Sequence, residues 1–352
     1  MGIVLNSDEQ PALPMLVTGL AGVPGYNAFH YFRSLYGDQV IGIRQPNMWP
    51  LKSEGIVPCD LDSENAIERL CDEYGFRSIL NAMGSCRLKS CELDPVMARR
   101  VNVLGTERLA QWAGRNHCRL IHLSIDLVFA GREGGDYQEH ETPDPVTVYG
   151  KMMVEAERAV QHFVSDPCIL RISLPMGISF NGHAGAVDWI AARFRQGKPA
   201  TLYFDEVRTP TYTDCMNRLF HRLFTHPITG LYHAGGSQRL SLFEIAQIVN
   251  VVGGYDPDLL TGCQRVEAGP MPPRAGNVSL NSQKLVNALR GAWADPWPLM
   301  GTYLPDSKIW HYENRVTHAG EELVHSTLYS NPRLSSFVPP NRNSLWGGAR
   351  FH

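Results

Sequence analysis

Short apolar runs alternate with longer amphipathic stretches along the first half of the chain. The apolar runs cover residues 15–17, 39–44, 78–82, 119–124 and 167–172. Between most of them, apolar residues recur at helical spacing over 26–35, 63–74, 94–116 and 149–163. Strands that alternate with helices of this length predict βαβ units and a parallel sheet with right-handed crossovers. The pattern therefore predicts the α/β class, with a doubly wound parallel sheet.

The pattern changes from about residue 180, where the elements become shorter and richer in Gly, Pro and Thr. A loop with a strand edge is expected over 206–212, a strand leading into a loop over 230–236, and a helix over 242–252 with Ser241 as its N-cap. These elements predict a smaller lobe that closes over the strand ends, so that cofactor and substrate meet in a crevice.

The predicted organisation has four parts. They are an N-terminal tail (1–13), a Rossmann-type dinucleotide-binding domain (14–175), a smaller C-terminal substrate lobe that shares part of the sheet (176–302), and an aromatic-rich extension (303–352). The extension has weak periodicity and two interpretations. It either wraps its own lobe, which we favour, or docks a protein partner or a second copy of the chain.

Composition excludes several functional classes. Among 352 residues, 32 Lys and Arg face 35 Asp and Glu, so the charge balance gives no support to nucleic-acid binding. No apolar run is long enough for a membrane span, and the N-terminus lacks the pattern of a secretory signal. The eight cysteines form no CxxC pair and the histidines no ligand motif, so we expect no metal site, and reduced thiols in a cytoplasmic protein.

A glycine-rich turn follows the first predicted strand. Thr18 precedes Gly19, Gly22 and Gly25, and a helix follows. In such a turn the first glycine permits the tight bend, the second lets the backbone approach a pyrophosphate, and the third lets the helix pack closely. The three-three spacing departs from GxGxxG, but its strand–helix context predicts a dinucleotide site that includes Thr18, Val23 and the three glycines.

The end of the second strand distinguishes the two nicotinamide dinucleotides. An acidic residue there would bind the ribose 2′-hydroxyl of NAD, but the position holds Arg44. A guanidinium suits a 2′-phosphate, so NADP is expected, with NAD and a plain surface arginine as the alternatives. Asp60 and Leu61, after the third strand, are expected to flank the adenine.

Further motifs follow in order over about residues 15–290. They are Thr18–Gly25, Asn81–Ala82, Val101–Thr106, His122–Gly131, Tyr137–Glu139, Pro145–Gly150, Arg208–Tyr212 and Asn277–Asn281. Together they resemble the extended short-chain dehydrogenases/reductases, and most of all the dTDP-4-dehydrorhamnose reductase branch. That branch also contains the regulatory subunit of methionine adenosyltransferase, which acts as a partner protein.

The resemblance implies reduction of a nucleotide-linked 4-keto sugar. Hydride moves from the nicotinamide, a tyrosine supplies the proton, a lysine holds the nicotinamide ribose, and a Ser or Thr binds the ketone oxygen. Tyr149 is the matching tyrosine, and Asn81, Ala82 and Asn102 join the expected cofactor contacts. The expected substrate contacts are Asp126, Arg171, Arg208 and Arg274. Arg171 is alternatively a core-rim residue, and Arg208 and Arg274 are alternatively solvated arginines rather than pyrophosphate ligands.

Two members of the expected catalytic group are absent. The lysine belongs four residues after Tyr149, where Met153 stands, while Lys151 lies on another face of the helix. The family hydroxyl aligns with Ile125. Ser124 is the remaining candidate, although neighbouring strand residues face opposite ways.

Two hypotheses remain open. The first is an atypical NADP(H)-dependent reductase of a nucleotide-linked keto sugar or similar ketone, with Tyr149 and Ser124 as its catalytic residues. The second is a catalytically inactive nucleotide-binding subunit that regulates or scaffolds, as a homo-oligomer or through a protein partner bound by 303–352. Non-redox chemistry in the same crevice is a third possibility that no residue specifies.

Overall fold

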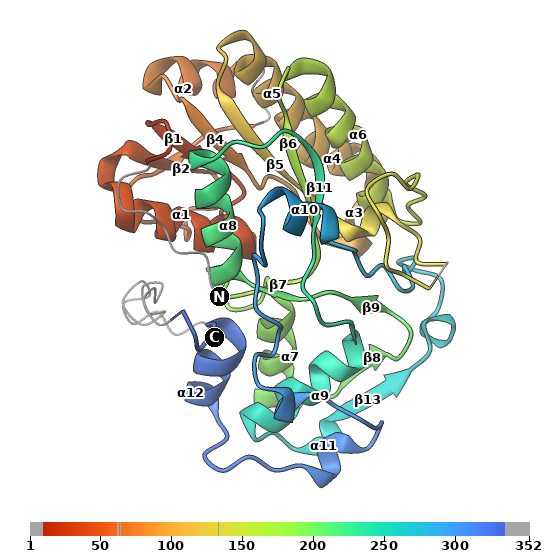
Figure 1. Ribbon diagram of the computed structural model, residues 1–352. Coiled ribbons are helices and arrows are strands. Elements are labelled where there is room, and N and C mark those ends of the chain that lie inside the picture. The colour runs from red at the N-terminus through yellow and green to blue at the C-terminus, as the bar shows by residue number, and fades with distance from the viewer. Residues whose placement is uncertain (1–9, 62, 64, 133, 335–352) are drawn as a thin grey trace.

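A seven-stranded parallel sheet forms the centre of the computed structural model, which describes residues 10–334 apart from 62, 64 and 133 (Figure 1). Its strand order is β11-β6-β5-β4-β1-β2-β3, and every neighbouring pair is parallel. The order reverses between β1 and β4, which is where doubly wound sheets bind ligands. The predicted fold class is confirmed.

Five strands of this sheet, β1, β2, β4, β5 and β6, lie where the apolar runs predict them. No range was predicted for β3, and β11, which was expected in the second lobe, pairs with β6 at the end of this sheet. The bounds are β1 Met15–Val17, β2 Val40–Arg44, β3 Ile56–Pro58, β4 Ser78–Asn81, β5 Arg119–Ile125, β6 Cys168–Ile172 and β11 Gly230–Ala234. All residues of β1, β4 and β6 are buried. Near-continuous burial is expected of a parallel sheet that is covered on both faces, and it explains why these runs do not alternate apolar with polar residues.

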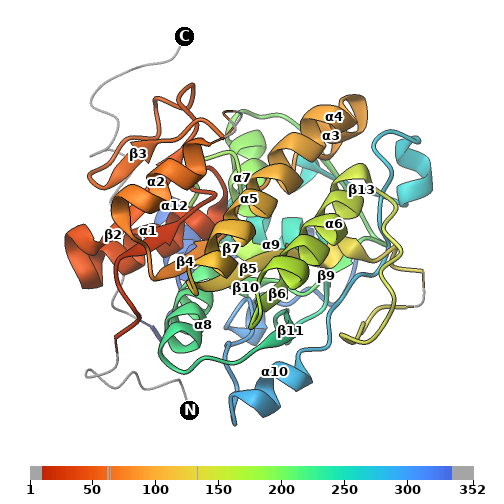
Figure 2. The ribbon, with the colours of Figure 1, turned by 90° about the horizontal axis from the view of Figure 1, so that it is seen from above.

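Helices cover the two faces of the sheet (Figure 2). On one face, α1 Val23–Tyr36 packs against α8 Thr213–Thr225. On the other, α5 Gly105–Arg115 contacts both α2 Ala66–Tyr74 and α6 Val148–Phe163. The carboxyl ends of the strands face the second lobe (Figure 1).

The single helix expected over 94–116 differs in its interior. It consists of α4 Pro95–Arg99, a π-helical turn η2 Arg100–Leu104, and α5, after a short helix α3 Leu88–Leu93. The Asn102 amide donates to the Ala98 carbonyl at 2.9 Å and accepts from the Ser85 backbone at 2.7 Å. Hydrophobic periodicity does not distinguish a single π-helical turn from the α-helices on either side of it.

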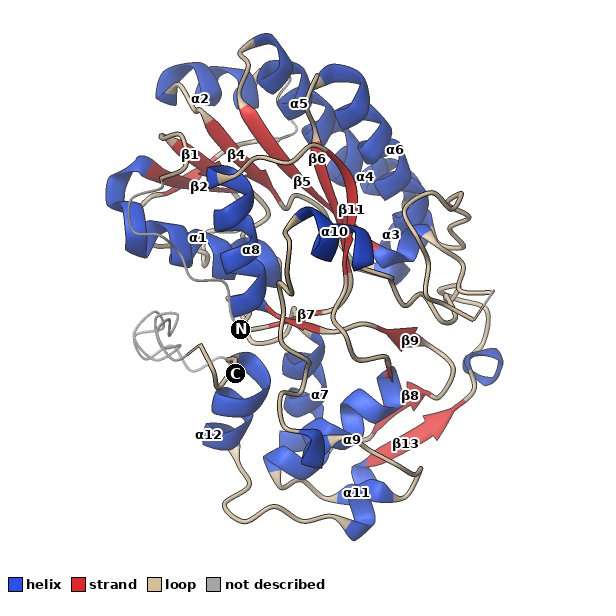
Figure 3. Ribbon diagram, in the orientation of Figure 1, coloured by secondary structure: helices blue, strands red, loops and turns tan. Residues whose placement is uncertain are grey.

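The second lobe is built from short strand pairs and helices (Figure 3). Its strands are β7 Pro175–Met176, β8 Ala200–Tyr203, β9 Val207–Arg208, β10 Thr211–Tyr212, β12 Leu240–Ser241 and β13 Leu260–Cys263, which pair as β7–β10, β9–β12 and β8–β13. Its helices are α7 Ala186–Arg195, α9 Leu242–Gly253 and α10 Gln283–Ala288. Ser241 caps α9 as predicted, accepting from the Glu244 backbone at 3.1 Å.

Short turns and the start of the extension complete the described chain. The 3-10 turns are η1 Gly37–Gln39, η3 Asp126–Val128, η4 Pro257–Leu259, η5 Arg265–Ala268 and η6 Gly301–Tyr303. Two short helices, α11 Trp310–Glu313 and α12 Glu321–Val324, are followed by a π-helical turn η7 His325–Tyr329. Within the described ranges, no helix has both the length and the apolar character that a membrane crossing requires.

The extension packs on its own lobe as far as residue 334. Tyr212 Oη donates to the Thr327 carbonyl at 2.7 Å, and Tyr329 Oη donates to Asp188 at 2.6 Å. Tyr329 also belongs to the buried cluster that contains residues of the central sheet and of α9. This part therefore wraps as expected. Residues 335–352, which include the aromatic positions 337, 346 and 351, lie outside the described residues.

Candidate functional site

The glycine turn between β1 and α1 has the geometry that its spacing predicts. Gly19 has φ +70°, and a Cβ there would lie 1.8 Å from the Ala82 carbonyl oxygen. A Cβ on Gly25 would lie 2.5 Å from the Gly19 oxygen and 2.6 Å from the Thr18 oxygen. Both positions therefore require glycine, one for its conformation and both for close backbone approach.

The N-terminus of α1 fits a phosphate. Gly22 is its N-cap in extended conformation, with no side-chain cap, and the first turn carries no acidic residue. A Cβ on Gly22 would meet nothing closer than the Gly19 oxygen at 3.4 Å. Free amide groups and the helix dipole at such an end attract an anion, so this turn can hold a dinucleotide pyrophosphate.

Other expected cofactor residues lie at the carboxyl ends of β1 and β4, next to the glycine turn. The side chains of two of them hydrogen-bond to other groups of the protein. Thr18 Oγ1 donates to Asn81 Oδ1 at 2.7 Å and accepts from the Ala82 backbone at 3.1 Å. The Asn81 amide nitrogen lies 3.1 Å from His122 Nδ1. The Thr18 and Asn81 side chains thus fix the ends of β1 and β4, while the backbone around Ala82 borders the turn.

Arg44 and the end of β3 lie next to one another. The Arg44 carbonyl accepts from the Cys59 backbone at 2.8 Å, which places Asp60 and Leu61 beside β2. One guanidinium nitrogen of Arg44 donates to the carbonyls of Gln45 and Pro46, each at 3.1 Å. The arginine is therefore tethered at the strand end, where a ribose 2′-phosphate would be recognised.

Tyr149 lies in the first turn of α6 and is held there by local capping. Thr147 Oγ1 accepts from the Gly150 backbone at 3.0 Å, and a Cβ on Gly150 would lie 2.2 Å from the Leu127 carbonyl. Tyr149 is 7% exposed. Burial raises the pKa of its phenol above the ordinary value, and Arg208 opposes that rise in part. Tyr149 is therefore neutral, which is the form that donates a proton.

The two replaced positions lie beside Tyr149. Met153 is 2% exposed and belongs with Tyr149, Leu127 and Val278 to one buried apolar cluster. Ile125, extended at the end of β5, packs against the same cluster. Met153 and Ile125 therefore occupy the positions at which the family has a lysine and a hydroxyl residue. Neither side chain can donate a hydrogen bond, so Tyr149 has no charged or hydroxyl group beside it from these two positions.

Arg171 and Glu157 form a buried ion pair, to which Ser124 hydrogen-bonds. Ser124 Oγ donates to Glu157, and Arg171 donates to the two Glu157 oxygens at 2.9 and 2.8 Å. Glu157 lies two turns after Tyr149 on α6. Burial and the Arg171 charge lower the pKa of the neighbouring His233 to about 3, so that imidazole is neutral. Arg171 is 3% exposed, which agrees with the core position rather than with a crevice surface.

Removing Arg171 should reveal how this ion pair contributes to stability. Arg171→Leu leaves the buried Glu157 carboxylate without its partner, and we expect the free energy of unfolding to fall by about 3–5 kcal/mol. Arg99→Leu breaks the exposed Arg99–Glu155 pair and should change it by less than about 1 kcal/mol. Urea unfolding of both variants measures the difference, and equal losses would refute the assignment.

Asp126 and Arg208, both expected substrate contacts, bind each other. Arg208 donates to the Asp126 oxygens at 2.7 and 2.6 Å, and it is 5% exposed. It is therefore not a solvated arginine. Glu206 lies 3.7 Å from Arg208 and 3.7 Å from Arg274, and this arrangement joins the end of β5 to the second lobe. The negative charges of Asp126 and Glu206 balance the positive charges of Arg208 and Arg274. Within this group, Arg274 is the partly exposed guanidinium, so it is the one that an anion can reach.

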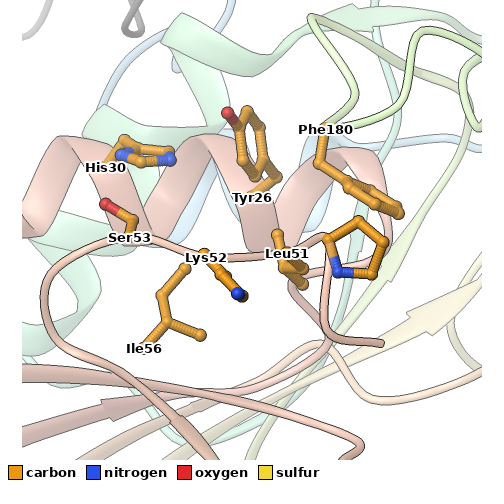
Figure 4. A pocket seen from close by; sticks show the side chains of 8 residues that line it. Tyr26, His30, Leu51, Lys52, Ser53, Ile56 and Phe180 are labelled. Atoms are coloured by element: carbon orange, nitrogen blue, oxygen red, sulfur yellow. The ribbon is translucent and has the colours of Figure 1, made fainter. Parts of the chain in front are cut away.

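A separate pocket lies between α1, the loop after Arg44, and Phe180 (Figure 4). It has about 260 Å³ of empty volume, is open to solvent, and is lined by residues that include Tyr26, Leu51 and Lys52. His30 points into it; its Nε2 has no hydrogen-bond partner, and burial lowers its pKa to about 4. The pocket shares no residue with the region around Tyr149.

Sequence reasoning missed the buried acids and one loop residue. Glu157 and Glu206 were not predicted, although a glutamate two turns from Tyr149 on an apolar helix face is a usable signal. Asn102, an expected cofactor contact, hydrogen-bonds to the Ser85 backbone in the loop after β4. Among the described residues, no group of three or more His, Cys, Asp or Glu is placed to hold a metal ion.

Known proteins of several kinds are similar to this chain. A probable low-salt glycan biosynthesis reductase of Haloferax volcanii is 28% identical over 196 residues, which are 55% of this chain and 65%, less than two thirds, of that protein. Methionine adenosyltransferase 2 subunit beta of Danio rerio is 25% identical, covering 78% of this chain and 84% of its own.

A solved structure and a family model extend these similarities. The dTDP-4-dehydrorhamnose reductase of Bacillus anthracis in complex with NADP superposes with a TM-score of 0.68 and 18% identity, covering 80% of this chain and 95% of that one. This likeness shows the fold. The model of the RmlD substrate binding domain matches residues 14–297, which include the glycine turn, Tyr149 and the Asp126–Arg208 pair. The chain therefore belongs to the RmlD substrate binding domain family.

Proposed function

We propose that this protein is an NADP(H)-dependent reductase that acts on a nucleotide-linked keto sugar or a similar ketone, with Tyr149 as its only proton donor. The observation that carries the proposal is the geometry of the glycine turn together with that of Tyr149. A glycine turn whose Gly19 and Gly25 have no room for a side chain lies at the carboxyl end of β1, and a buried, neutral phenol lies in the first turn of α6. A chain used only for packing would need neither feature.

Different residues would bind the cofactor and donate the proton. The turn at Gly19, Gly22 and Gly25 would hold the pyrophosphate, and Arg44 would hold a ribose 2′-phosphate. NADPH, when bound, supplies a hydride. Tyr149 would donate its phenolic proton to the ketone oxygen, and its raised pKa keeps that proton in place over the whole physiological range.

Recognition of the substrate would fall to the second lobe. Arg274 is the expected contact for the pyrophosphate of a nucleotide sugar, because it lies over the Tyr203 ring at 4.9 Å and is partly exposed. The Asp126–Arg208 pair would position that lobe over the sheet edge. Relatives whose names describe reductases of glycan and deoxysugar synthesis support this substrate class.

A second candidate is a nucleotide-binding subunit without hydride chemistry. It is favoured by the apolar surroundings of Tyr149, where Met153 and Ile125 replace a cation and a hydroxyl. The match to methionine adenosyltransferase 2 subunit beta points the same way. In this case the extension from residue 303 would bind a protein partner or a second copy of the chain.

Restoring the missing groups separates the two candidates. The double variant Met153→Lys with Ile125→Thr should raise turnover of a keto-sugar nucleotide by about tenfold or more, since one positioned acid–base group contributes factors of this order. The matched control is Met152→Lys, which adds the same charge one position away, at a half-buried side chain about 100° around the helix from Met153.

The readout is NADPH oxidation together with NADPH affinity. Increased turnover only in the double variant supports a weakened reductase. An unchanged rate in a folded double variant that binds NADPH would contradict the reductase and leave the subunit role. Because a lysine at a buried position can destabilise the fold, the unfolding transition of each variant is compared first.

A further inference from the structure

The pocket beside α1 is a cavity that the proposed reaction does not use (Figure 4). Three segments line it: α1 through Tyr26 and His30, the loop over 50–56, and Phe180, which lies between β7 and α7. Its empty volume of about 260 Å³ includes space open to solvent. Pockets for drug-sized ligands usually measure about 300–1,000 Å³, so the size suits a smaller ligand with a single ring.

The walls of this pocket are fixed by hydrogen bonds to neighbouring backbone. In the loop, the Leu51 backbone donates to the Met48 carbonyl at 3.0 Å. Across the pocket, the Asn27 side chain on α1 donates to the Ile178 carbonyl at 2.7 Å, two residues before Phe180. Ligand pockets are usually formed before the ligand arrives, and these contacts give the three segments a defined arrangement.

His30 supplies a buried polar atom that the protein leaves unsatisfied. The side chain is 8% exposed, and its Nε2 has no hydrogen-bond partner in the described part of the chain. Its ring packs edge-on against Tyr26 and Phe29, with ring centroids 4.5 and 5.2 Å apart. These contacts account for the position of the ring but not for Nε2, whose burial costs free energy unless a bound molecule supplies a partner.

The protonation of His30 defines the partner that Nε2 can take. Burial lowers the pKa of the imidazole to about 4, so the ring is neutral at pH 7. In a neutral imidazole Nε2 either donates or accepts, depending on the tautomer. A hydroxyl group both donates and accepts, so it satisfies Nε2 in either case.

Lys52 makes the rim of the pocket positive. Its side chain is exposed, and its ammonium lies 5.6 Å from the centre of the exposed Trp49 ring. Among the described residues that line the pocket, none is acidic. Glu54, nearby in the loop, lies 3.3 Å from the Arg33 guanidinium in an ion pair of its own. An anionic group of a ligand would therefore be attracted to this rim.

The surface between His30 and Lys52 is apolar. Tyr26, Leu51 and Phe180 line it, and each is less than a tenth exposed. Aromatic and aliphatic side chains of this kind pack against the faces of a planar ring.

We propose that this pocket binds a small aromatic monocarboxylate that carries a hydroxyl group opposite its carboxylate. The ring would pack against Leu51 and Phe180, the hydroxyl would hydrogen-bond to His30 Nε2, and the carboxylate would lie at Lys52. The site goes beyond the proposed reductase function, because the pocket shares no residue with the glycine turn or with the region around Tyr149.

Three probes test the chemistry of the site on the full-length wild-type chain without NADPH. An NMR titration with 4-hydroxyphenylacetate should give a dissociation constant of about 1 mM or below, which is ordinary for a ligand of this size. Phenylacetate lacks the hydroxyl, and 4-hydroxyphenylacetamide lacks the charge. Each should bind about fivefold more weakly, because one hydrogen bond or one ion pair is lost.

Two substitutions locate the probe in the pocket. His30→Phe keeps a ring and removes Nε2, so it should weaken 4-hydroxyphenylacetate about fivefold and leave phenylacetate unchanged. The free energy of unfolding should not fall, because Nε2 has no partner in the described protein. Lys52→Met should weaken both carboxylates about fivefold and leave the amide unchanged. Lys198→Met, at another exposed lysine, is the matched control and should bind all three probes normally.

Two results would overturn the assignment. One is no binding of 4-hydroxyphenylacetate to the wild-type chain at about 10 mM, well above the expected dissociation constant. The other is binding that both His30→Phe and Lys52→Met leave unchanged, since the probe would then lie elsewhere. Because these titrations contain no NADPH, either result leaves the reductase proposal to its own tests.

Discussion

Gly22→Ala should weaken NADPH binding by about 100-fold while the protein remains folded, because a methyl group there occupies the space that the pyrophosphate needs. The expectation follows from the free space around Gly22, where a Cβ meets no protein atom closer than 3.4 Å. Gly25→Ala should instead lose both binding and stability, since its Cβ would overlap two carbonyl oxygens.

Gly75 provides the matched control for the effect of an added methyl group. It ends α2 in the left-handed region, at φ +60°, with nothing within 4 Å of a built Cβ. Gly75→Ala should cost about 1 kcal/mol of stability from backbone strain and leave NADPH binding intact. Fluorescence titration with NADPH and urea unfolding measure both quantities. Wild-type affinity in Gly22→Ala would mean that no pyrophosphate approaches this turn.

Tyr149→Phe should lower keto-sugar reduction by about 10² to 10⁴-fold, which is the usual contribution of a positioned general acid. The substitution removes one oxygen and keeps the ring in its buried cluster, so stability and NADPH affinity should change little. With wild-type Tyr149, the rate should also show no loss between pH 7 and 9 from ionisation of this residue, because burial raises its pKa.

Tyr137→Phe is the control for this effect. Tyr137 lies in the same buried cluster and stacks on Phe129 with ring centroids 4.1 Å apart, but it is no part of the proposed proton path. Its loss should leave turnover within about twofold. Steady-state kinetics with NADPH measures the turnover of both variants and of the wild-type protein. Equal activity of Tyr149→Phe and the wild-type protein would remove Tyr149 from the mechanism.

The local parts of the fold and site could be predicted from the sequence. The glycine turn depends on three residues within one strand–helix connection, and the Ser241 cap on residues three apart, so spacing alone identifies them. The five strands β1, β2, β4, β5 and β6 could be predicted because both faces of the sheet are covered, so that these strands are continuous apolar runs.

The long-range parts could not be predicted in the same way. Asp126 and Arg208 are 82 residues apart, and their pairing depends on how the second lobe closes on β5. The use of Ser124 in the Glu157 ion pair depends on the contact between β5 and α6.

The most direct test of the account is a titration of the purified chain with NADPH and with NADH, followed through the fluorescence of its seven tryptophans. We expect saturable binding of both dinucleotides, with NADPH bound about tenfold more tightly because Arg44 ends β2. If neither dinucleotide binds, the glycine turn is not a cofactor site, and the reductase proposal is contradicted.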